Sequence, residues 1–196
     1  QYVKIIDFFT LLFEASQPYK NFEKQIIFRL NGVSQSHEGI SINEKMIPLV
    51  KREPELIHGI RNIVHNALKF SKSHVDINLI TNSTKINLEI TDDGKGFPND
   101  ITNMIGEPFL KKSNFYLMEV KNRRSEEGMG LGLFIANILL EKTKGRLKFS
   151  NMQQIENDGK KRITGAKVEI SWERSSIEVL QWDKKAKMKE NPRNVS

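Results

Sequence analysis

The chain has 196 residues, with 31 Lys and Arg against 24 Asp and Glu, a net charge of +7, and no Cys. This length suits one domain with extra segments and allows a hydrophobic core without covalent staples. The lack of Cys excludes disulfides, Cys-ligated zinc and a thiol nucleophile, and it fits a reducing compartment. The basic excess suits an anionic ligand or an acidic partner. No basic stripe with interleaved aromatic residues points to nucleic acid.

No stretch approaches the roughly 18 uninterrupted apolar residues that a membrane-spanning helix needs, and no signal peptide is recognisable. The chain begins with Gln1, so we expect it to be a piece of a longer protein. Residues 183–196 carry five bases and two acids. This composition predicts a solvated basic tail at the end of the chain.

The first quarter of the chain predicts one helix and one strand. Apolar residues at helical spacing predict a helix over 1–17, which Pro18 ends. The apolar run over 25–30 predicts a strand. A turn-rich stretch over 31–39 follows it, and then a short apolar segment over 46–50.

The rest of the chain mixes helices and strands without strict alternation, which favours an α+β fold over a doubly wound sheet. In chain order we expect a helix over 54–70, a hairpin of strands over 75–81 and 85–91, a short helix near Pro98, a helix over 131–142, and strands over 146–151 and 166–172 around a polar loop at 152–165.

The predicted helix over 54–70 carries an unusual polar stripe opposite its apolar face. Asn62, Asn66, Lys69, His58 and His65 fall within about 100° of its circumference. A polar stripe on an amphipathic helix is usually only solvated. Amides are poor helix formers, however, and the carbonyl oxygen of Asn is a suitable ligand for Mg²⁺.

Two glycine-rich segments follow. Asp92-Asp-Gly-Lys-Gly96 comes directly after a predicted strand, where it could be an ordinary turn or a close approach of the backbone to a ligand. Gly128-Met-Gly-Leu-Gly132 opens a helix, where backbone N–H groups favour anions. It matches neither a Walker A motif nor the Rossmann fingerprint. Each segment alone is a weak signal.

The order of these segments is far more specific. Asn62-Ile-Val-His-Asn66, then Asp92-Asp-Gly-Lys-Gly96, then Glu107-Pro-Phe109, then Gly128-Met-Gly-Leu-Gly132 resembles the N, G1, F and G2 boxes of the catalytic, ATP-binding domain of sensor histidine kinases. That domain belongs to the superfamily of gyrase, Hsp90, histidine kinases and MutL. The resemblance covers about residues 20–173. More narrowly, the chain looks like the Reg/Prr redox-responding sensor kinases.

The resemblance implies roles for several of these residues around the adenine base of the nucleotide. Asp92 would accept a hydrogen bond from the exocyclic amine of adenine. Gly94 and Gly96 would let the backbone pass close to the base. Phe109 would pack the near end of a lid over about residues 106–127, whose apolar part either packs on the base of the lid or docks on a helical hairpin.

The resemblance also implies the residues that hold the phosphates. Asn66 would ligate a Mg²⁺ ion that bridges the phosphates of ATP, with Asn62 beside it and Lys69 reaching a phosphate. Four residues would wrap the phosphate tail, namely Gly128, Gly130, Leu131 and Gly132. His65, next to the metal ligand, could contact phosphate, support the ligand or be solvated.

Asn62 bears on the reaction. Hydrolysing members of the superfamily place a Glu at this position to activate water, and Asn cannot act as a general base. The residues therefore favour ATP that is held for phosphoryl transfer. The family's phosphoacceptor histidine lies in a particular sequence context on a preceding helical hairpin. None of the four histidines has that context, namely His37, His58, His65 and His74.

We therefore expect a two-layer α/β sandwich, with a mixed sheet of about five strands backed by three helices and a mobile ATP lid. Residues 1–19 would end a hairpin helix or form a linker, 20–175 would be the catalytic domain and 176–196 a basic tail. The implied cofactors are ATP and Mg²⁺. The implied partners are the phosphoacceptor hairpin and a response regulator, in a homodimeric parent anchored in the bacterial inner membrane with this domain in the cytoplasm. The alternatives are a hydrolytic ATPase and a degenerate domain kept for protein contacts.

Overall fold

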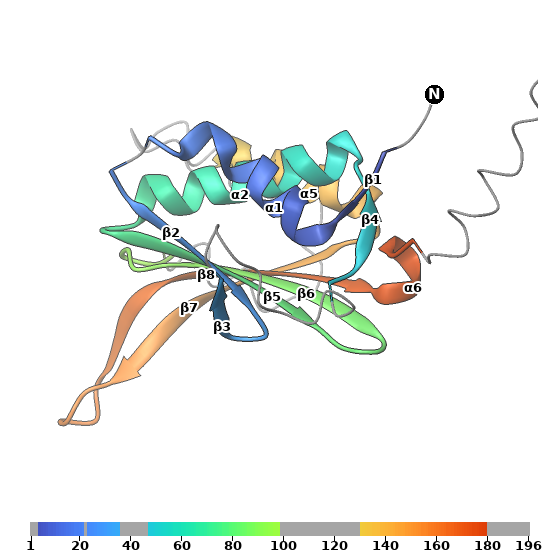
Figure 1. The fold of residues 1–196 in the computed structure, drawn as a ribbon. Helices are drawn as coiled ribbons and strands as arrows, with labels where there is room; N and C mark the ends of the chain where they lie inside the picture. The colour runs from blue at the N-terminus through green and yellow to red at the C-terminus, as the bar shows by residue number, and fades with distance from the viewer. Residues whose placement is uncertain (1–3, 22, 36–46, 99–129, 180–196) are drawn as a thin grey trace, which may run out of the picture.

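A computed structural model describes residues 4–21, 23–35, 47–98 and 130–179. Their main sheet has six strands and carries helices on one of its faces (Figure 1). The six strands of the sheet, in spatial order, are β3 (Val33–Gln35), β2 (Gln25–Leu30), β5 (His74–Thr81), β6 (Lys85–Asp92), β8 (Lys161–Glu173) and β7 (Arg146–Ile155). β2 and β5 are parallel and the other pairs are antiparallel. The predicted two-layer fold with a mixed sheet is confirmed.

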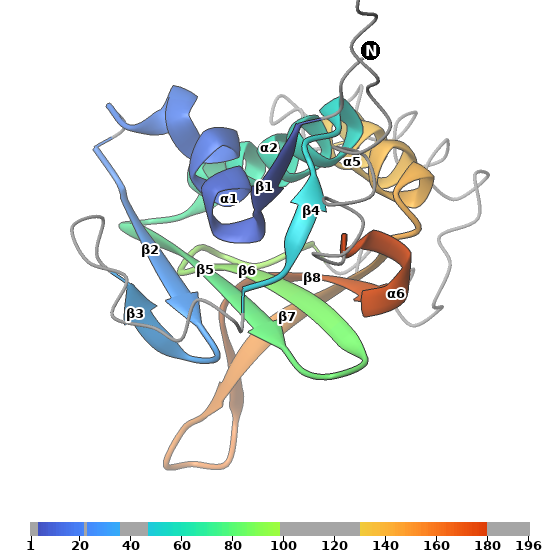
Figure 2. The same ribbon diagram turned by 45° about the vertical axis from the view of Figure 1, so that its right-hand side comes forward.

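The helical layer contains α1 (Phe8–Ser16), α2 (Pro54–Phe70) and α5 (Gly130–Lys142), with a 3₁₀ turn, η1 (Gln17–Tyr19), after α1. A second sheet pairs β1 (Ile5–Asp7) with β4 (Leu49–Lys51) (Figure 2). A short helix, α6 (Arg174–Ile177), follows β8. No helix in the described part of the chain is long and apolar enough to cross a lipid bilayer.

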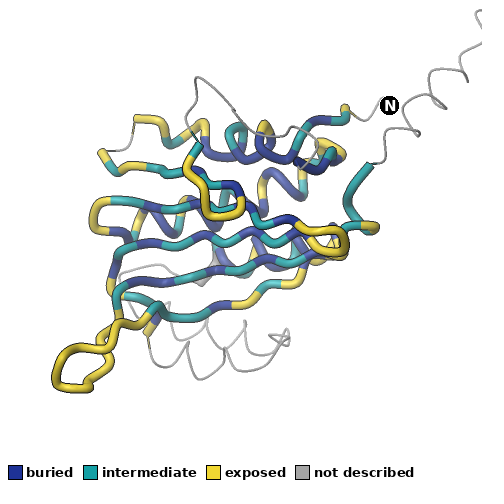
Figure 3. The backbone as a smooth tube through the Cα atoms, turned by 60° about the horizontal axis from the view of Figure 1, so that its bottom comes forward, coloured by how far each residue is buried: buried dark blue, intermediate teal, exposed yellow. Residues whose placement is uncertain are grey.

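The sheet has one apolar face and one polar face. Side chains on β5 and β6 alternate strictly between buried and less buried (Figure 3), because successive residues of a strand point to opposite faces. The buried residues meet the helices. The opposite face carries ion pairs between neighbouring strands, such as Arg29 with Asp76 at 2.5 Å and Lys167 with Glu89. The helices therefore cover the apolar face of the sheet, and the paired charges lie on the other face.

Helix α2 is the centre of the helical layer and packs against both α1 and α5. Pro54 lies in its first turn, where the missing N–H costs nothing. Its C-terminus is held by Lys24, whose Nζ donates to the carbonyl oxygens of Leu68 and Ser71, both at 2.6 Å. A cation is favourable there because the last carbonyls of a helix have no partner within it. This contact holds the end of α2 that reaches the site.

The first helix begins later than the predicted range of 1–17. Residues 5–7 form β1 instead, and Asp7 is the N-cap of α1, since its Oδ1 accepts from the backbone N–H of Thr10 at 2.8 Å. Five apolar residues of α1 are almost fully buried in the common core, namely Phe8, Phe9, Leu11, Leu12 and Ala15. The described part of residues 1–19 thus packs with the domain that follows. Its assignment to a hairpin helix or linker stays a prediction.

The polar loop predicted at 152–165 is wrong, because β7 and β8 continue through it as an antiparallel arm that projects from the sheet away from the helical layer (Figure 1). The ladder shifts register at Met152/Gln153, and the turn is limited to the residues around Asp158. The arm is exposed on both faces, so it needs no apolar alternation, and the sequence pattern did not reveal it. The short strand β3 likewise lies within the stretch expected to be a turn.

The chain after β8 returns to the small sheet. The N–H of Val179 donates to the carbonyl of Leu49 at 2.7 Å, and Glu178 forms a bridge with Val50. The predicted tail over 176–196 therefore begins with residues that pack beside β4. The rest of the tail lies outside the described residues, as do the lid and most of the helix predicted after Pro98.

Asp93, directly after β6, ties the start of β5 to the end of β6. Its carboxylate accepts from the backbone N–H groups of Lys72 and Ser73 and from the hydroxyl of Ser73. Partial burial acts to raise the pKa of Asp93, but the hydrogen bonds from Ser73, Lys72 and His74 outweigh it and hold this pKa well below its usual range. The clamp fixes the turn between α2 and β5.

We expect Leu12→Ala to lower the free energy of unfolding of the whole domain by about 2–5 kcal/mol, because it leaves a cavity in the shared core. The measurement is urea unfolding followed by tryptophan fluorescence and circular dichroism. Gln17→Ala, an exposed position in η1, is the control and should change little. A domain transition that Leu12→Ala leaves unchanged would mean that α1 is a separate element.

We expect Asp93→Asn to destabilise the domain by about 1–3 kcal/mol at pH 7, because charged hydrogen bonds are lost. Since the folded pKa is lowered, the ionised carboxylate stabilises the fold above the unfolded pKa of about 3.9, and this contribution disappears as pH falls through the folded pKa. The difference between wild type and variant should therefore shrink below about pH 4. Urea unfolding at pH 7 and pH 3 measures it, with Asp158→Asn in the exposed arm as the isosteric control. An equal difference at both pH values would contradict the role of the charge.

Candidate functional site

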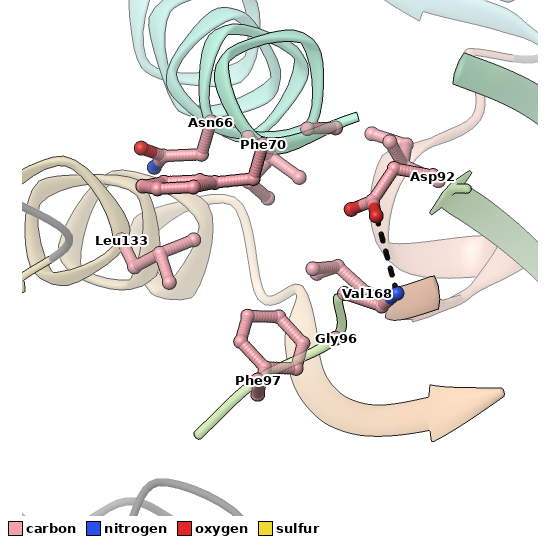
Figure 4. A pocket seen from close by; sticks show the side chains of 11 residues that line it. Asn66, Phe70, Asp92, Gly96, Phe97, Leu133 and Val168 are labelled. Atoms are coloured by element: carbon pink, nitrogen blue, oxygen red, sulfur yellow. Dashed lines mark hydrogen bonds between the residues drawn. The ribbon is translucent and has the colours of Figure 1, made fainter. Parts of the chain in front are cut away.

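A pocket opens between α2, the start of α5 and the helix-facing side of β6 and β8 (Figure 4). It encloses about 410 Å³, its open mouth included. Its walls are mostly apolar and consist of Ile63, Ala67 and Phe70 of α2, Ile90 of β6, Leu133 of α5, Ala166 and Val168 of β8, and Gly96 and Phe97 of the loop after β6. Two polar side chains enter this lining, those of Asp92 and Asn66.

Asp92 ends β6 at the inner wall of the pocket and is only 6 % exposed. Its Oδ1 accepts from the backbone N–H of Gly94 at 2.8 Å and from that of Ala166 at 3.3 Å. Both bonds use the same oxygen, so Oδ2 has no partner among the described residues. Burial raises the pKa of Asp92, and the two backbone hydrogen bonds offset this only in part. The carboxylate is thus rigidly oriented and retains acceptor capacity.

Gly165 allows β8 to pass directly over Asp92. A Cβ at Gly165 would lie 1.7 Å from the carbonyl oxygen of Asp92. Since that oxygen belongs to the backbone of a central strand, it cannot move aside. This close approach brings the N–H of Ala166 to the carboxylate. Sequence reasoning did not include Gly165, because it placed this residue at the end of the loop predicted over 152–165, where a glycine is unremarkable.

Asn66 lies on the pocket side of α2, facing the first turn of α5. Its Nδ2 is buried and has no hydrogen-bond partner within the described ranges. A Cβ at Gly132 would lie 3.0 Å from this nitrogen, so the two helices meet closely at this point. A buried amide without a partner costs free energy, and a ligand that engages the Asn66 amide would remove that cost.

The other predicted residues of α2 lie outside the pocket lining. Asn62 is half-buried one turn before Asn66, and Lys69 is exposed, with its Nζ 5.2 Å from the centre of the Phe70 ring. His65 stacks on Tyr19 of η1, with ring centres 5.4 Å apart and planes 20° apart. His65 is exposed, as its solvated alternative expects, and one face of its ring is covered by Tyr19. Its possible contacts with phosphate or with the metal ligand stay predictions.

The glycine motifs divide into described and undescribed parts. Gly94 is buried behind Asp92 and supplies one of its hydrogen bonds, and Gly96 lines the pocket. Gly130 and Leu131 begin α5, where only their backbone is described, and Gly132 follows beside Asn66. Phe109 and Gly128 lie outside the described residues, so their predicted roles stay predictions.

Several residues of the site were missed by sequence reasoning. Phe70, Phe97 and Ala166 line the pocket, and Asn151 of β7 holds the backbone of Phe97 through its side chain. Phe70 and Phe97 directly follow predicted motif residues, and this proximity was the only available signal. Asn151 lies 54 positions from Phe97 in the chain, and no local pattern distinguishes it from other polar strand residues.

The arrangement suits a flat heterocycle that carries an amine and is attached to an anion. The apolar walls can enclose an aromatic ring, and the free oxygen of Asp92 can accept from an exocyclic amine. The N-terminus of α5 lies near Asn66 at the other end, and its backbone N–H groups favour negative charge. The described residues contain no group of three or more His, Asp or Glu side chains that could hold a metal ion. Of the two polar side chains that line the pocket, that of Asn66 offers a neutral oxygen that could ligate a metal together with oxygens of the anion.

Comparisons with known proteins agree with this geometry. Residues 51–175 match the family described as histidine kinase-, DNA gyrase B- and HSP90-like ATPase. Sensor histidine kinase RegB of Cereibacter sphaeroides is 36 % identical over 165 residues, which cover 83 % of this chain and 34 % of that protein. Histidine-protein kinase ArlS of Staphylococcus haemolyticus is 27 % identical over 131 residues, 64 % of this chain and 28 % of that protein. The chain thus spans about a third of the length of these relatives.

Solved structures share the fold. Mycobacterial sensor histidine kinase MprB is 19 % identical, with a TM-score of 0.57 over 88 % of this chain and 97 % of that one. The nucleotide-free catalytic domain of histidine kinase ThkA is 16 % identical, with a TM-score of 0.56 over 89 % and 97 %. The match to RegB agrees with the narrower resemblance to Reg/Prr kinases. The order of the motifs, the pocket and these matches together show that the chain belongs to the family of histidine kinase-, DNA gyrase B- and HSP90-like ATPases, among relatives that are sensor histidine kinases.

Proposed function

We propose that the chain is the ATP-binding catalytic domain of a two-component sensor kinase. It binds Mg-ATP and donates the γ-phosphoryl group to a histidine on a dimerisation hairpin outside this chain, for relay to an aspartate of a response regulator. The observation that carries the proposal is the buried Asp92, held by two backbone N–H groups at the end of an apolar pocket with one oxygen left to accept.

Asp92 selects the base. An ionised carboxylate accepts hydrogen bonds only, so it pairs with the exocyclic amine of adenine and opposes the carbonyl that guanine carries at the equivalent position. Phe70 and Phe97 enclose the ring from the helix side and the loop side. The amine of the base supplies a partner for Oδ2 of Asp92, the oxygen that accepts neither of the two backbone hydrogen bonds.

Asn66 and the start of α5 hold the phosphates. The Nδ2 atom of Asn66 is buried without a hydrogen-bond partner among the described residues, and the carbonyl oxygen of this side chain is a suitable Mg²⁺ ligand. When bound, Mg²⁺ would neutralise part of the phosphate charge. Lys69, exposed on the adjacent turn of α2, adds a flexible cation that can reach a phosphate. These groups would position the phosphates and neutralise their charge, and phosphoryl transfer requires little else from the protein.

Asn62 supports transfer over hydrolysis. It lies one turn before Asn66 on α2 and is half-buried. An amide cannot take a proton from an attacking water molecule. The chain also holds no histidine in the context of the family's phosphoacceptor. We therefore propose a catalytic fragment that binds ATP and transfers phosphate only to a hairpin supplied in trans or in the parent.

The parent protein is proposed to be a membrane-anchored homodimer that places this domain in the cytoplasm. Within the chain, we propose that the domain includes α1, since the buried residues of that helix belong to the common core. The domain then extends to about Val179, which pairs with β4. We further propose that residues 183–196, which carry five bases, are a tail that follows this domain.

We expect Asp92→Asn to weaken ATP binding by about 10- to 150-fold, because the charged hydrogen bond to the base is worth roughly 1.5–3 kcal/mol. The measurement is isothermal titration of Mg-ATP into the wild type and the variant at pH 7. Asp158→Asn, the same isosteric change in the exposed arm, should bind like the wild type. GTP should bind the wild type more weakly than ATP.

Three outcomes would contradict parts of the proposal. A wild-type chain that binds no ATP would favour a degenerate domain kept for protein contacts. Steady release of inorganic phosphate by the isolated chain would favour a hydrolytic ATPase. Acid-labile phosphate incorporated into the isolated chain would mean that one of its own histidines is the acceptor.

A further inference from the structure

The side chain of Asn151 on β7 makes two hydrogen bonds to the backbone of a single residue. The N–H of Phe97 donates to Oδ1 of Asn151 at 2.6 Å, and Nδ2 of Asn151 donates to the carbonyl oxygen of Phe97 at 3.0 Å. The amide thus satisfies both polar groups of one peptide position, as a neighbouring strand would do. The loop after β6 gains an anchor on β7 although it belongs to no strand itself.

The anchored residue forms part of the pocket. Phe97 is 7 % exposed, lines the cavity and packs edge-on against Phe149, with ring centres 5.8 Å apart. Phe149 and Asn151 are two residues apart on β7, so their side chains point to the same face of the sheet. β7 therefore holds both the ring and the backbone of Phe97.

The backbone of the loop at Gly96 lies so close to the Asn151 side chain that there is no room for a Cβ between them. Gly96 has a φ of +79°, and a Cβ at this position would lie 2.7 Å from Oδ1 of Asn151. Any other residue at Gly96 would be strained and would also push this oxygen away from the N–H of Phe97. The glycine and the amide depend on each other.

One cross-strand pair holds both ends of this loop. Asn151 is the partner of Ala166 in the β7–β8 ladder. Ala166 holds the carboxylate of Asp92 through its N–H, and Asn151 holds Phe97. The segment 92–97 is therefore held at its first residue by β8 and at its last residue by β7. The distance from the carboxylate to the aromatic wall of the pocket is set by the sheet.

We propose that Asn151 is a positioning residue for the base of the nucleotide. It acts through Phe97 and Gly96 and keeps the wall of the pocket in place before the ligand arrives. The inference rests on the proposed binding of ATP. A loop ordered in advance does not lose conformational freedom on binding, so the anchor strengthens binding at the base and leaves the phosphate end unchanged.

The test compares Asn151→Ala with the wild type in nucleotide titrations and in hydrogen exchange. We expect the dissociation constants of ATP, ADP and adenosine all to rise by a similar factor of about 5 to 30. The amide of Phe97 should exchange much faster, and that of Val168 in the sheet should keep its protection. In transfer to a hairpin supplied in trans, KM for ATP should rise while kcat at saturating ATP stays near the wild-type value.

Two variants complete the experiment. Asn157→Ala, in the exposed turn of the arm, is the matched control and should change none of these readouts. If Asn151→Ala does not fold, Asn151→Asp keeps the volume and the acceptor for the N–H of Phe97 but loses the donor to its carbonyl. It should weaken binding of all three ligands as well.

Different failures separate this inference from the proposed function. Wild-type affinity for adenosine in Asn151→Ala, with the Phe97 amide exposed to exchange, would overturn the positioning role and leave ATP binding intact. A loss confined to ATP and ADP would place the effect at the phosphates and also overturn it. A wild-type chain that binds none of the three ligands would overturn the proposed function, and the positioning role with it.

Discussion

The close passage of β8 over the end of β6 is the constraint on which the site depends. Gly165 has no room for a side chain because the backbone of Asp92 occupies that space. The same passage delivers the N–H of Ala166 to the Asp92 carboxylate and sets Asn151, across the ladder, against Phe97. A single backbone contact in the sheet therefore orients the charged group, the loop and the aromatic wall of the pocket together.

Helix α2 completes the site because its different faces contact the core, the pocket and Tyr19. Its apolar face fills the core, Asn66 faces the pocket, and His65 stacks on Tyr19 toward α1. Lys24 donates to the carbonyl oxygens of Leu68 and Ser71 at its C-terminal end. The helix therefore packs on the sheet with one face and against α1 with another, and Lys24 binds its C-terminus. The amide of Asn66 is presented from a rigid support, as its proposed role as a Mg²⁺ ligand requires.

Asp92 and Asp93, two adjacent carboxylates at the end of β6, have pKa values shifted in opposite directions by their local environments. Asp92 points into the apolar pocket, and burial raises its pKa. Asp93 points away, where hydrogen bonds from the turn before β5 overcome its burial and lower its pKa. Asp92 is the last residue of β6 and Asp93 is the first residue beyond it, so the pair separates into the proposed binding group and a structural clamp. The motif Asp-Asp-Gly-Lys-Gly contains both residues but does not tell them apart without the resemblance to the family.

The sequence by itself determined the amphipathic helix over 54–70, the alternating strands around 75–91 and the order of the nucleotide motifs, because these are local patterns of burial and backbone freedom. Periodicity reports which face of an element is buried, but not what lies opposite. Tertiary structure alone decided that α1 joins the core, that β7 and β8 extend as an arm, and that Gly165 and Asn151 serve the pocket. Asp92 and Ala166 are 74 positions apart and Phe97 and Asn151 are 54 apart. Contacts of this range form only when the sheet assembles, since each depends on the strand order and register that bring the partners together.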